Sequence, residues 1–173
     1  MVSALSPFMT GMPATSASDT RPIASCRLAA TIAAAWVTPD GAWLQLAATA
    51  LGVDWIVARA GELLETWSGS RLLVENTGTA AFLLPRLVAD TVPRRFYADA
   101  CSTLESAVTA RTLRHGNQPE LNDAVNARPA WPSLGETGQR VMSRKDPRVS
   151  PLVAAALALH GLSTADQSPP NLW

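Results

Sequence analysis

Residues 72–78, which read LLVENTG, constrain the fold more than any other stretch of the sequence. Three aliphatic residues run directly into Glu75, and Asn, Thr and Gly follow as turn-forming residues. A short apolar run without alternation is typical of a strand that is buried on both faces. Strands of α/β sheets end at the edge where ligands bind. A carboxylate at that edge either reaches solvent or meets a cation, because an unpaired buried charge is costly.

The composition favours one globular domain. Hydrophobic residues make up 47% of the 173 residues and charged residues 16%, which is the balance of a folded chain rather than a disordered one. The net charge is zero, so no global field favours a polyanionic partner. Cys26 and Cys101 lie far apart without a neighbouring Cys or His, which predicts neither a zinc site nor a disulfide framework.

Three segments follow from the local composition. Residues 1–26 are rich in Ser, Thr, Ala and Pro, and we expect them to be disordered or loosely attached. Residues 27–162 form the predicted domain, and residues 163–173 form a tail. The N-terminus has no secretory signal pattern, and the longest apolar run is too short to span a bilayer. We therefore expect a soluble cytoplasmic protein with no membrane partner.

The pattern along the domain predicts an α/β fold in which helices cover a small mixed sheet. Residues 27–37 and 42–51 read as a hairpin around a Thr-Pro-Asp-Gly turn, although the alanine content of the first run also allows a helix. Residues 128–147 read as a loop or a small hairpin. A further short strand is expected at 94–97. Helices are expected at residues 53–67, 80–90, 99–113, 119–127 and 150–160. Asp54 is the expected N-cap of the first helix, and Pro85 interrupts the second.

The second half of the chain resembles the C-terminal end of phage terminase large subunits. The matching runs are LRH at 113–115, QPELNDAV at 118–125, SR at 143–144 and VSPLVAAALA at 149–158. Upstream, the 55–67 helix, VENTG at 74–78 and the Ala100-Cys101 pair occur in the order that the family shows. The resemblance implies an RNase H-like nuclease domain, a mixed sheet flanked by helices, that cuts concatemeric viral DNA during genome packaging. The family's ATPase motor is not represented, since no P-loop motif occurs in these 173 residues.

The resemblance also implies a two-metal site for Mg²⁺ or Mn²⁺, built from clustered carboxylates. Glu75 keeps one expected acid position. Trp36 stands where the first strand should supply an aspartate, which leaves Asp40 as a poor substitute. Arg148 stands directly before the last helix in place of the third acid, which leaves Asp146. The predicted catalytic residues are therefore Glu75, Asp146 and Asp40, with Glu75 and Asp146 as metal ligands, and cleavage is expected to be impaired or absent, as in a decayed prophage copy.

Four basic residues cluster just before the last helix: Arg140, Arg144, Lys145 and Arg148. They either form a solvated loop or contact DNA phosphates beside the nuclease groove. The partners implied by the resemblance are double-stranded DNA and other packaging proteins, such as the terminase small subunit and the portal. Two alternatives remain: a catalytically inactive remnant that at most binds DNA or a partner, and an unrelated α/β interaction domain.

Overall fold

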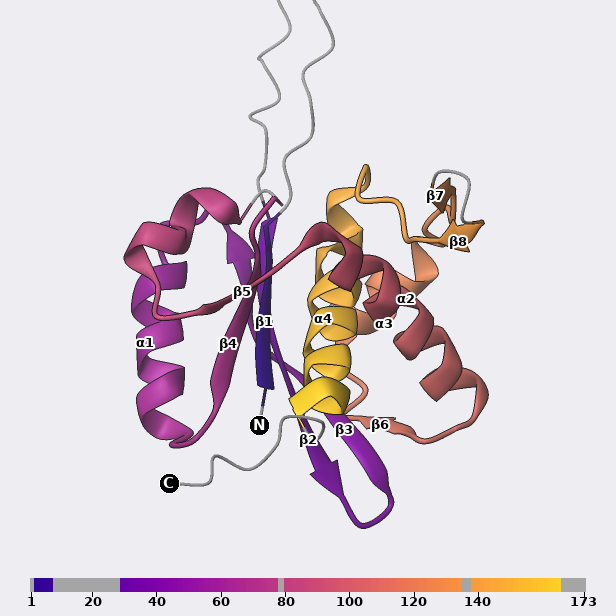
Figure 1. Cartoon of the computed structure of the whole chain (residues 1–173), viewed down its shortest axis with the longest axis horizontal. Coiled ribbons are helices and arrows are strands. Elements are labelled where there is room, and N and C mark those ends of the chain that lie inside the picture. Colours follow the sequence, from indigo (N-terminus) through magenta and orange to yellow (C-terminus); the bar gives the residue numbers. More distant parts are fainter. Residues whose placement is uncertain (1, 8–28, 78–79, 135–137, 166–173) are drawn as a thin grey trace, which may run out of the picture.

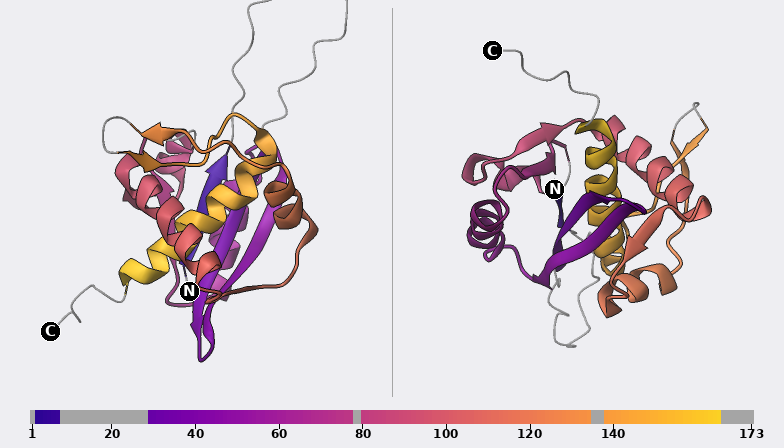
Figure 2. Two further views of the ribbon diagram at one scale, coloured as in Figure 1. Left: turned by 90° about the vertical axis from the view of Figure 1, so that its right-hand side faces the viewer. Right: turned by 90° about the horizontal axis from the view of Figure 1, so that it is seen from below.

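The chain folds around one six-stranded mixed sheet with helices on both faces (Figures 1 and 2). The structure is a computed structural model, and it describes residues 2–7, 29–77, 80–134 and 138–165. The strand order is β5-β4-β1-β2-β3-β6. The strands are β1 (Val2–Pro7), β2 (Ala29–Thr38), β3 (Gly41–Leu51), β4 (Arg71–Glu75), β5 (Asp90–Val92) and β6 (Leu113–His115).

Strands β1, β2 and β3 form an antiparallel meander, and β4 and β5 continue the sheet beyond β1 as parallel strands. At the other edge, β6 pairs parallel to β3. This arrangement confirms the predicted fold class, a mixed sheet flanked by helices, and it is consistent with an RNase H-like sheet. The predicted hairpin is also confirmed, since β2 pairs with β3 across the turn at 38–41.

The central strand β1 comes from a segment that the sequence predicted to be disordered or loosely attached. That prediction is wrong for Val2–Pro7, which lies between β4 and β2 and pairs with both. The sequence VSALSP carries no strong strand pattern of its own, and its partners lie far along the chain. Residues 8–26 of that segment and residues 166–173 of the expected tail fall outside the described part of the chain.

One helix dominates each face of the sheet. Helix α1 (Ile56–Thr66) covers one face, and α4 (Ser150–Ala165) crosses the other beside α2 (Arg94–Thr109) and α3 (Pro119–Asn126) (Figures 1 and 2). The core is correspondingly divided, because Ile32 and Val74 pack with α1 while Ala33 and Leu44 pack with α2 and α4. The alanine-rich α4 is buried almost all round, as expected for a helix enclosed by a sheet and two other helices.

Three local predictions need correction. Residues 94–97 are not a strand but the first turn of α2, which begins after an extended Pro93. The helix expected at 80–90 is only a 3₁₀ turn, η1 (Ala81–Arg86), because Pro85 supplies no backbone donor for a longer helix. Asp54 is not the N-cap of α1, since Trp55 holds that position without a side-chain hydrogen bond.

The segment between α3 and α4 is a loop with a small hairpin, as predicted. Its strands are β7 (Ser133–Leu134) and β8 (Gln139–Arg140), and a 3₁₀ turn, η3 (Pro147–Val149), leads into α4. Within the described part of the chain, no helix is both long and apolar enough to cross a membrane.

Candidate functional site

Glu75 is the last residue of β4, and its side chain is almost fully buried. Only 4% of the residue is exposed, although it carries a carboxylate. The chain then turns away, and the backbone N–H of Asn76 donates to the carbonyl of Val92 at 2.9 Å, next to β5. The apolar strand thus delivers one acid to the carboxyl end of the sheet, where the sequence predicted it.

Arg144 provides the cation that this buried carboxylate needs. Its Nη2 lies 2.5 Å from Oε2 of Glu75, and the two side chains are 29% and 5% exposed. Oε2 of Glu75 and both Nε and Nη2 of Arg144 have no hydrogen-bond partner among the described residues. The other oxygen of Glu75, Oε1, accepts a hydrogen bond from the Thr77 hydroxyl at 3.3 Å. The contact is therefore an ion pair without directed hydrogen bonds.

Helix α2 holds the Arg144 guanidinium in place. The guanidinium carbon lies 3.6 Å from the centre of the Tyr97 ring, which is a close cation–π contact. The Tyr97 hydroxyl donates to the carbonyl of Met142 at 2.8 Å, and the backbone N–H of Met142 contacts Sγ of Cys101 at 3.5 Å. The loop carrying Arg144 is therefore anchored to α2 at two points, two residues before the arginine.

Tyr97 and Cys101 are neutral components of this site. Burial raises the pKa of the Tyr97 hydroxyl far above its usual range, and the neighbouring Cys101 adds to the effect, while Arg144 acts in the opposite direction. Burial likewise raises the pKa of the Cys101 thiol. Neither side chain is an anion at neutral pH, so it is the Glu75 carboxylate that compensates the positive charge of Arg144.

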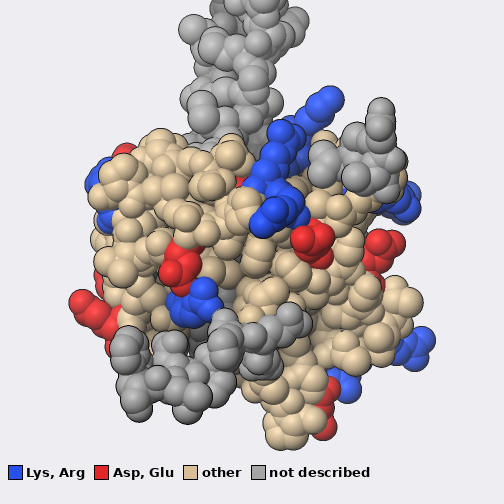
Figure 3. Space-filling view, viewed as in Figure 1, with Lys and Arg blue, Asp and Glu red and all other residues tan. Residues whose placement is uncertain are grey.

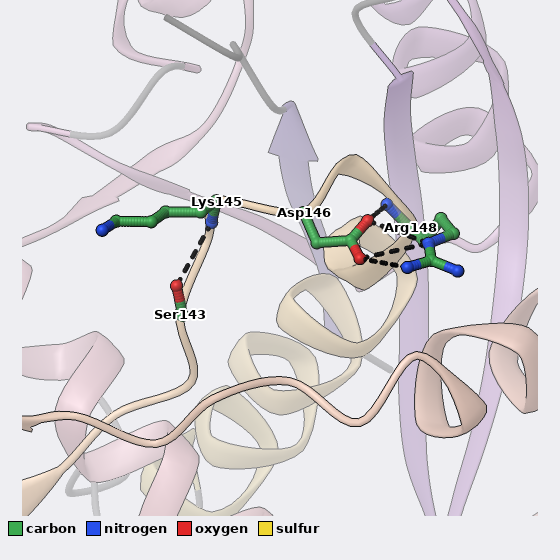
Figure 4. Close-up of polar contacts among 4 residues, drawn as sticks. All are labelled: Ser143, Lys145, Asp146 and Arg148. Atoms are coloured by element: carbon green, nitrogen blue, oxygen red, sulfur yellow. Dashed lines mark hydrogen bonds and ion pairs between the residues drawn. The ribbon is translucent and has the colours of Figure 1, made fainter.

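Asp146 is neutralised by a different arginine. Its carboxylate accepts from the backbone N–H of Arg148 at 2.9 Å and caps η3. It also binds the Arg148 guanidinium, with Nη2 at 2.6 Å from Oδ2 (Figure 4). The hydrogen bonds from Arg148 lower the pKa of the Asp146 carboxyl. Asp146 thus belongs to the same loop as Arg144, but both of its carboxylate oxygens accept hydrogen bonds from Arg148.

Asp40 does not come together with Glu75. It lies in the turn between β2 and β3, and β2 runs antiparallel to β1 while β4 runs parallel to it. Val2 of β1 is level both with Ala35 of β2 and with Arg71, the first residue of β4. The β2–β3 turn therefore lies beyond the start of β4, at the opposite end of the sheet from Glu75 (Figure 1).

The first strand of the sheet, β1, contains no acidic residue. The resemblance places a first-strand aspartate at the position of Trp36, but the first strand of this sheet is β1 and Trp36 lies on β2. Trp36 instead pairs with Trp43 near the β2–β3 turn, with ring centres 6.1 Å apart. The β1 sequence, VSALSP, contains no carboxylate. The central position beside β4 is therefore without the acid that the resemblance implies.

These residues do not fit a two-metal site. Such a site needs several carboxylates converging on two ions about 3.5–4 Å apart. Across the described ranges, no three His, Cys, Asp or Glu side chains are grouped so that they could hold a metal ion. The one acid at the expected position, Glu75, already contacts a guanidinium.

Of the four predicted DNA-binding residues, three remain at the surface. Arg140 is exposed on β8 near the Trp131 ring, Lys145 is exposed, and Arg148 is exposed but paired with Asp146. Figure 4 shows Lys145 extending away from the Asp146–Arg148 pair. Arg144 instead faces inward to Glu75.

Two further basic residues that the sequence did not predict as DNA-binding, Arg94 and Arg95, are exposed in the first turn of α2. The same helix holds Tyr97 against the Arg144 loop, so this turn lies close to that loop. Lys and Arg side chains gather on this side of the molecule near the start of α4 (Figure 3). The local signal was hidden because residues 94–97 were assigned to a strand.

An apolar cavity of about 470 Å³ lies away from these residues. It is bordered by side chains of β3, β6, α2, α3 and α4, including Leu44, Leu104 and Leu121. None of the predicted catalytic or DNA-binding residues lines it. This apolar cavity and the candidate site are therefore separate features of the molecule.

Comparison with known proteins adds one similar fold. No protein-family model and no curated protein sequence matches the chain. Among solved structures, the large terminase nuclease from thermophilic phage G20c is similar over 88% of this chain and 81% of that chain, with a TM-score of 0.48 and 14% sequence identity. Similarity of this degree assigns no role to any side chain.

Proposed function

We propose that this chain is a terminase nuclease-like domain that contacts double-stranded DNA without cutting it by a two-metal mechanism. The observation that carries the proposal is the ion pair between Glu75 and Arg144 at the carboxyl end of β4. The pair supports a structural rather than a catalytic role for Glu75.

The electrostatics of the pair oppose a divalent ion. At an effective dielectric near 20, two like unit charges about 4 Å apart repel by about 4 kcal/mol, and a divalent ion roughly doubles that cost. A metal at Glu75 would therefore have to displace the Arg144 guanidinium from Tyr97. Asp146 offers little compensation, because its carboxylate binds Arg148.

The first test is cleavage of supercoiled plasmid in millimolar Mn²⁺ or Mg²⁺. We expect no metal-dependent cutting above the level of a Glu75→Ala variant, because the chain supplies too few free carboxylates to bind and activate two ions. Efficient cutting by the wild-type protein that disappears in Glu75→Ala would overturn the proposal.

Contact with DNA is supported by the basic residues around the Arg144 loop. Arg94, Arg95, Arg140 and Lys145 are exposed on two neighbouring segments. The first two also lie at the N-terminal end of α2, where the helix dipole adds to their positive potential. Such a surface suits phosphate contacts, which carry affinity but no base sequence.

Reversing charge on this surface is expected to weaken DNA binding. In an Arg95→Glu/Lys145→Glu variant, we expect lower affinity for any duplex sequence and a salt slope shallower by about two, because about one counterion is released per phosphate contact. Fluorescence anisotropy with a labelled duplex at several salt concentrations measures both. Arg59→Glu/Arg86→Glu on α1 and η1, across the sheet, reverses the same number of charges and is the matched control. Equal losses in both variants would show that the surface has no specific role.

A further inference from the structure

We propose that the apolar cavity among β3, β6, α2, α3 and α4 binds a small uncharged molecule with an apolar body and one hydroxyl or amide group. The cavity lies on the side of the molecule where α2, α3 and β6 meet (right in Figure 1). It combines an apolar interior with one polar corner whose side chains are held in place by hydrogen bonds. The proposal is independent of DNA contact by the Arg144 loop.

The interior of the cavity suits an apolar ligand. Its volume of about 470 Å³ lies within the range of pockets that hold small molecules, roughly 300–1,000 Å³. Leu44, Leu104 and Leu121 are buried and form its inner wall. Val108 and Val125 also line it, and they are 58% and 55% exposed, so they mark its opening to solvent. Transfer of an apolar ligand from water to such a surface is favourable.

The wall formed by α3 is tied to the sheet by the side chain of Gln118, the N-cap residue of that helix. The side-chain oxygen of Gln118 accepts from the backbone N–H of Leu46 at 2.7 Å, and its amide nitrogen donates to the Leu46 carbonyl at 3.0 Å. These bonds fix the start of α3 against β3, just beyond the residues that pair with β6. A cavity whose walls are already in place loses little conformational entropy when a ligand binds.

The polar corner of the cavity is organised by Asn117. This residue joins β6 to α3 and has a left-handed backbone, with φ = +54°. Its backbone N–H donates to Nδ1 of His115 at 3.2 Å, and its side-chain oxygen accepts from Nδ2 of Asn122 at 2.9 Å. His115 and Asn122 both line the cavity, so one loop residue orients both of them.

These hydrogen bonds decide which polar groups are left for a ligand. Because His115 accepts at Nδ1, its ring carries the proton on Nε2 and donates from there. Asn122 donates through Nδ2, which leaves its side-chain oxygen as an acceptor. A donor and an acceptor in one corner suit a ligand group that both accepts and donates, as a hydroxyl or an amide does. No Asp, Glu, Lys or Arg is among the described residues that line the cavity, which favours an uncharged ligand.

The test is an NMR titration of the full chain with 2-naphthol, which carries one hydroxyl on an apolar ring system. We expect saturable shifts with a dissociation constant on the order of 0.1–1 mM, as follows for a ligand of this size. The matched probe 2-methylnaphthalene has nearly the same shape without the hydroxyl. It should bind about tenfold more weakly, because it leaves His115 and Asn122 without their partner. His115→Phe keeps a ring but removes the donor, and it should weaken 2-naphthol binding by a similar factor.

Two blocking variants test the location of the site. Val108→Trp and Val125→Trp each place a large ring at the opening, and both should fold because the two valines are largely exposed. Each should weaken 2-naphthol binding by about tenfold or more, since the ring occupies the ligand's space. Val88→Trp is the matched control, because Val88 is 84% exposed and its neighbours Leu87 and Ala89 pack on the α1 side of the sheet. It should bind 2-naphthol like the wild type.

Four outcomes would overturn the inference. They are no saturable binding of 2-naphthol to the wild type, equal affinity for the two probes, unchanged affinity in His115→Phe, and binding that survives both blocking variants. Self-association of the wild type that Val108→Trp abolishes, measured by sedimentation velocity, would show that a second copy covers the opening, and would also overturn it.

Discussion

Replacing Arg144 by methionine is expected to lower the free energy of unfolding by about 3–5 kcal/mol, because it leaves Glu75 buried without a counter-charge. Methionine keeps an apolar stem against Tyr97, so the loss reports mainly on charge. Glu75→Gln combined with Arg144→Met should recover much of the loss, since the double variant removes the uncompensated carboxylate. Urea unfolding of the three variants without metal measures this cycle.

Arg148→Met is the matched control for that experiment. It removes an arginine from the same loop, but the pair with Asp146 is exposed, and an exposed pair stabilises the fold far less than a buried one. Similar losses in Arg144→Met and Arg148→Met would contradict the distinction between the two pairs. A double variant as unstable as Arg144→Met would show that packing against Tyr97, and not charge, holds the loop.

Gly41→Ala is expected to destabilise the fold strongly. Gly41 has φ = +123°, and a Cβ placed on it would lie 2.3 Å from the carbonyl oxygen of Thr112. That oxygen accepts the Ala42 N–H at 3.0 Å and fixes the approach of β6 to β3. The backbone strain costs roughly 1–3 kcal/mol, and the overlap adds about 1–3 kcal/mol more.

Comparison with Gly52→Ala separates the cost of steric overlap at Gly41 from the cost of backbone strain. Gly52 also has a positive φ, +78°, but an added Cβ there would meet nothing within 4 Å. We expect it to lose only about 1–2 kcal/mol, the cost of an L-residue in a left-handed conformation. Thermal or urea unfolding of both variants gives the comparison. Equal losses of unfolding free energy in the two variants would mean that β6 can move away from β3 at little cost.

Much of the local structure could be predicted from the sequence because its causes are local. The apolar run before Glu75 predicted a buried strand, and the Thr-Pro-Asp-Gly turn predicted the hairpin. The Pro at the first position of α3 and the apolar residues of α4 predicted those helices. Failures occurred where the local signal was weak or ambiguous, as in the Arg-Arg-Phe-Tyr run that opens α2.

The site depended on contacts that no local pattern contains. The sequence by itself determined that Glu75 ends a buried strand, because the apolar run that buries the strand and the acid that follows it lie in one short segment. Only the tertiary structure decided that Val2–Pro7 is the central strand, that Asp40 lies at the far end of the sheet, and that Arg144 reaches Glu75. Those outcomes depend on strand order and loop anchoring, which arise when segments far apart in the chain compete for the same buried positions.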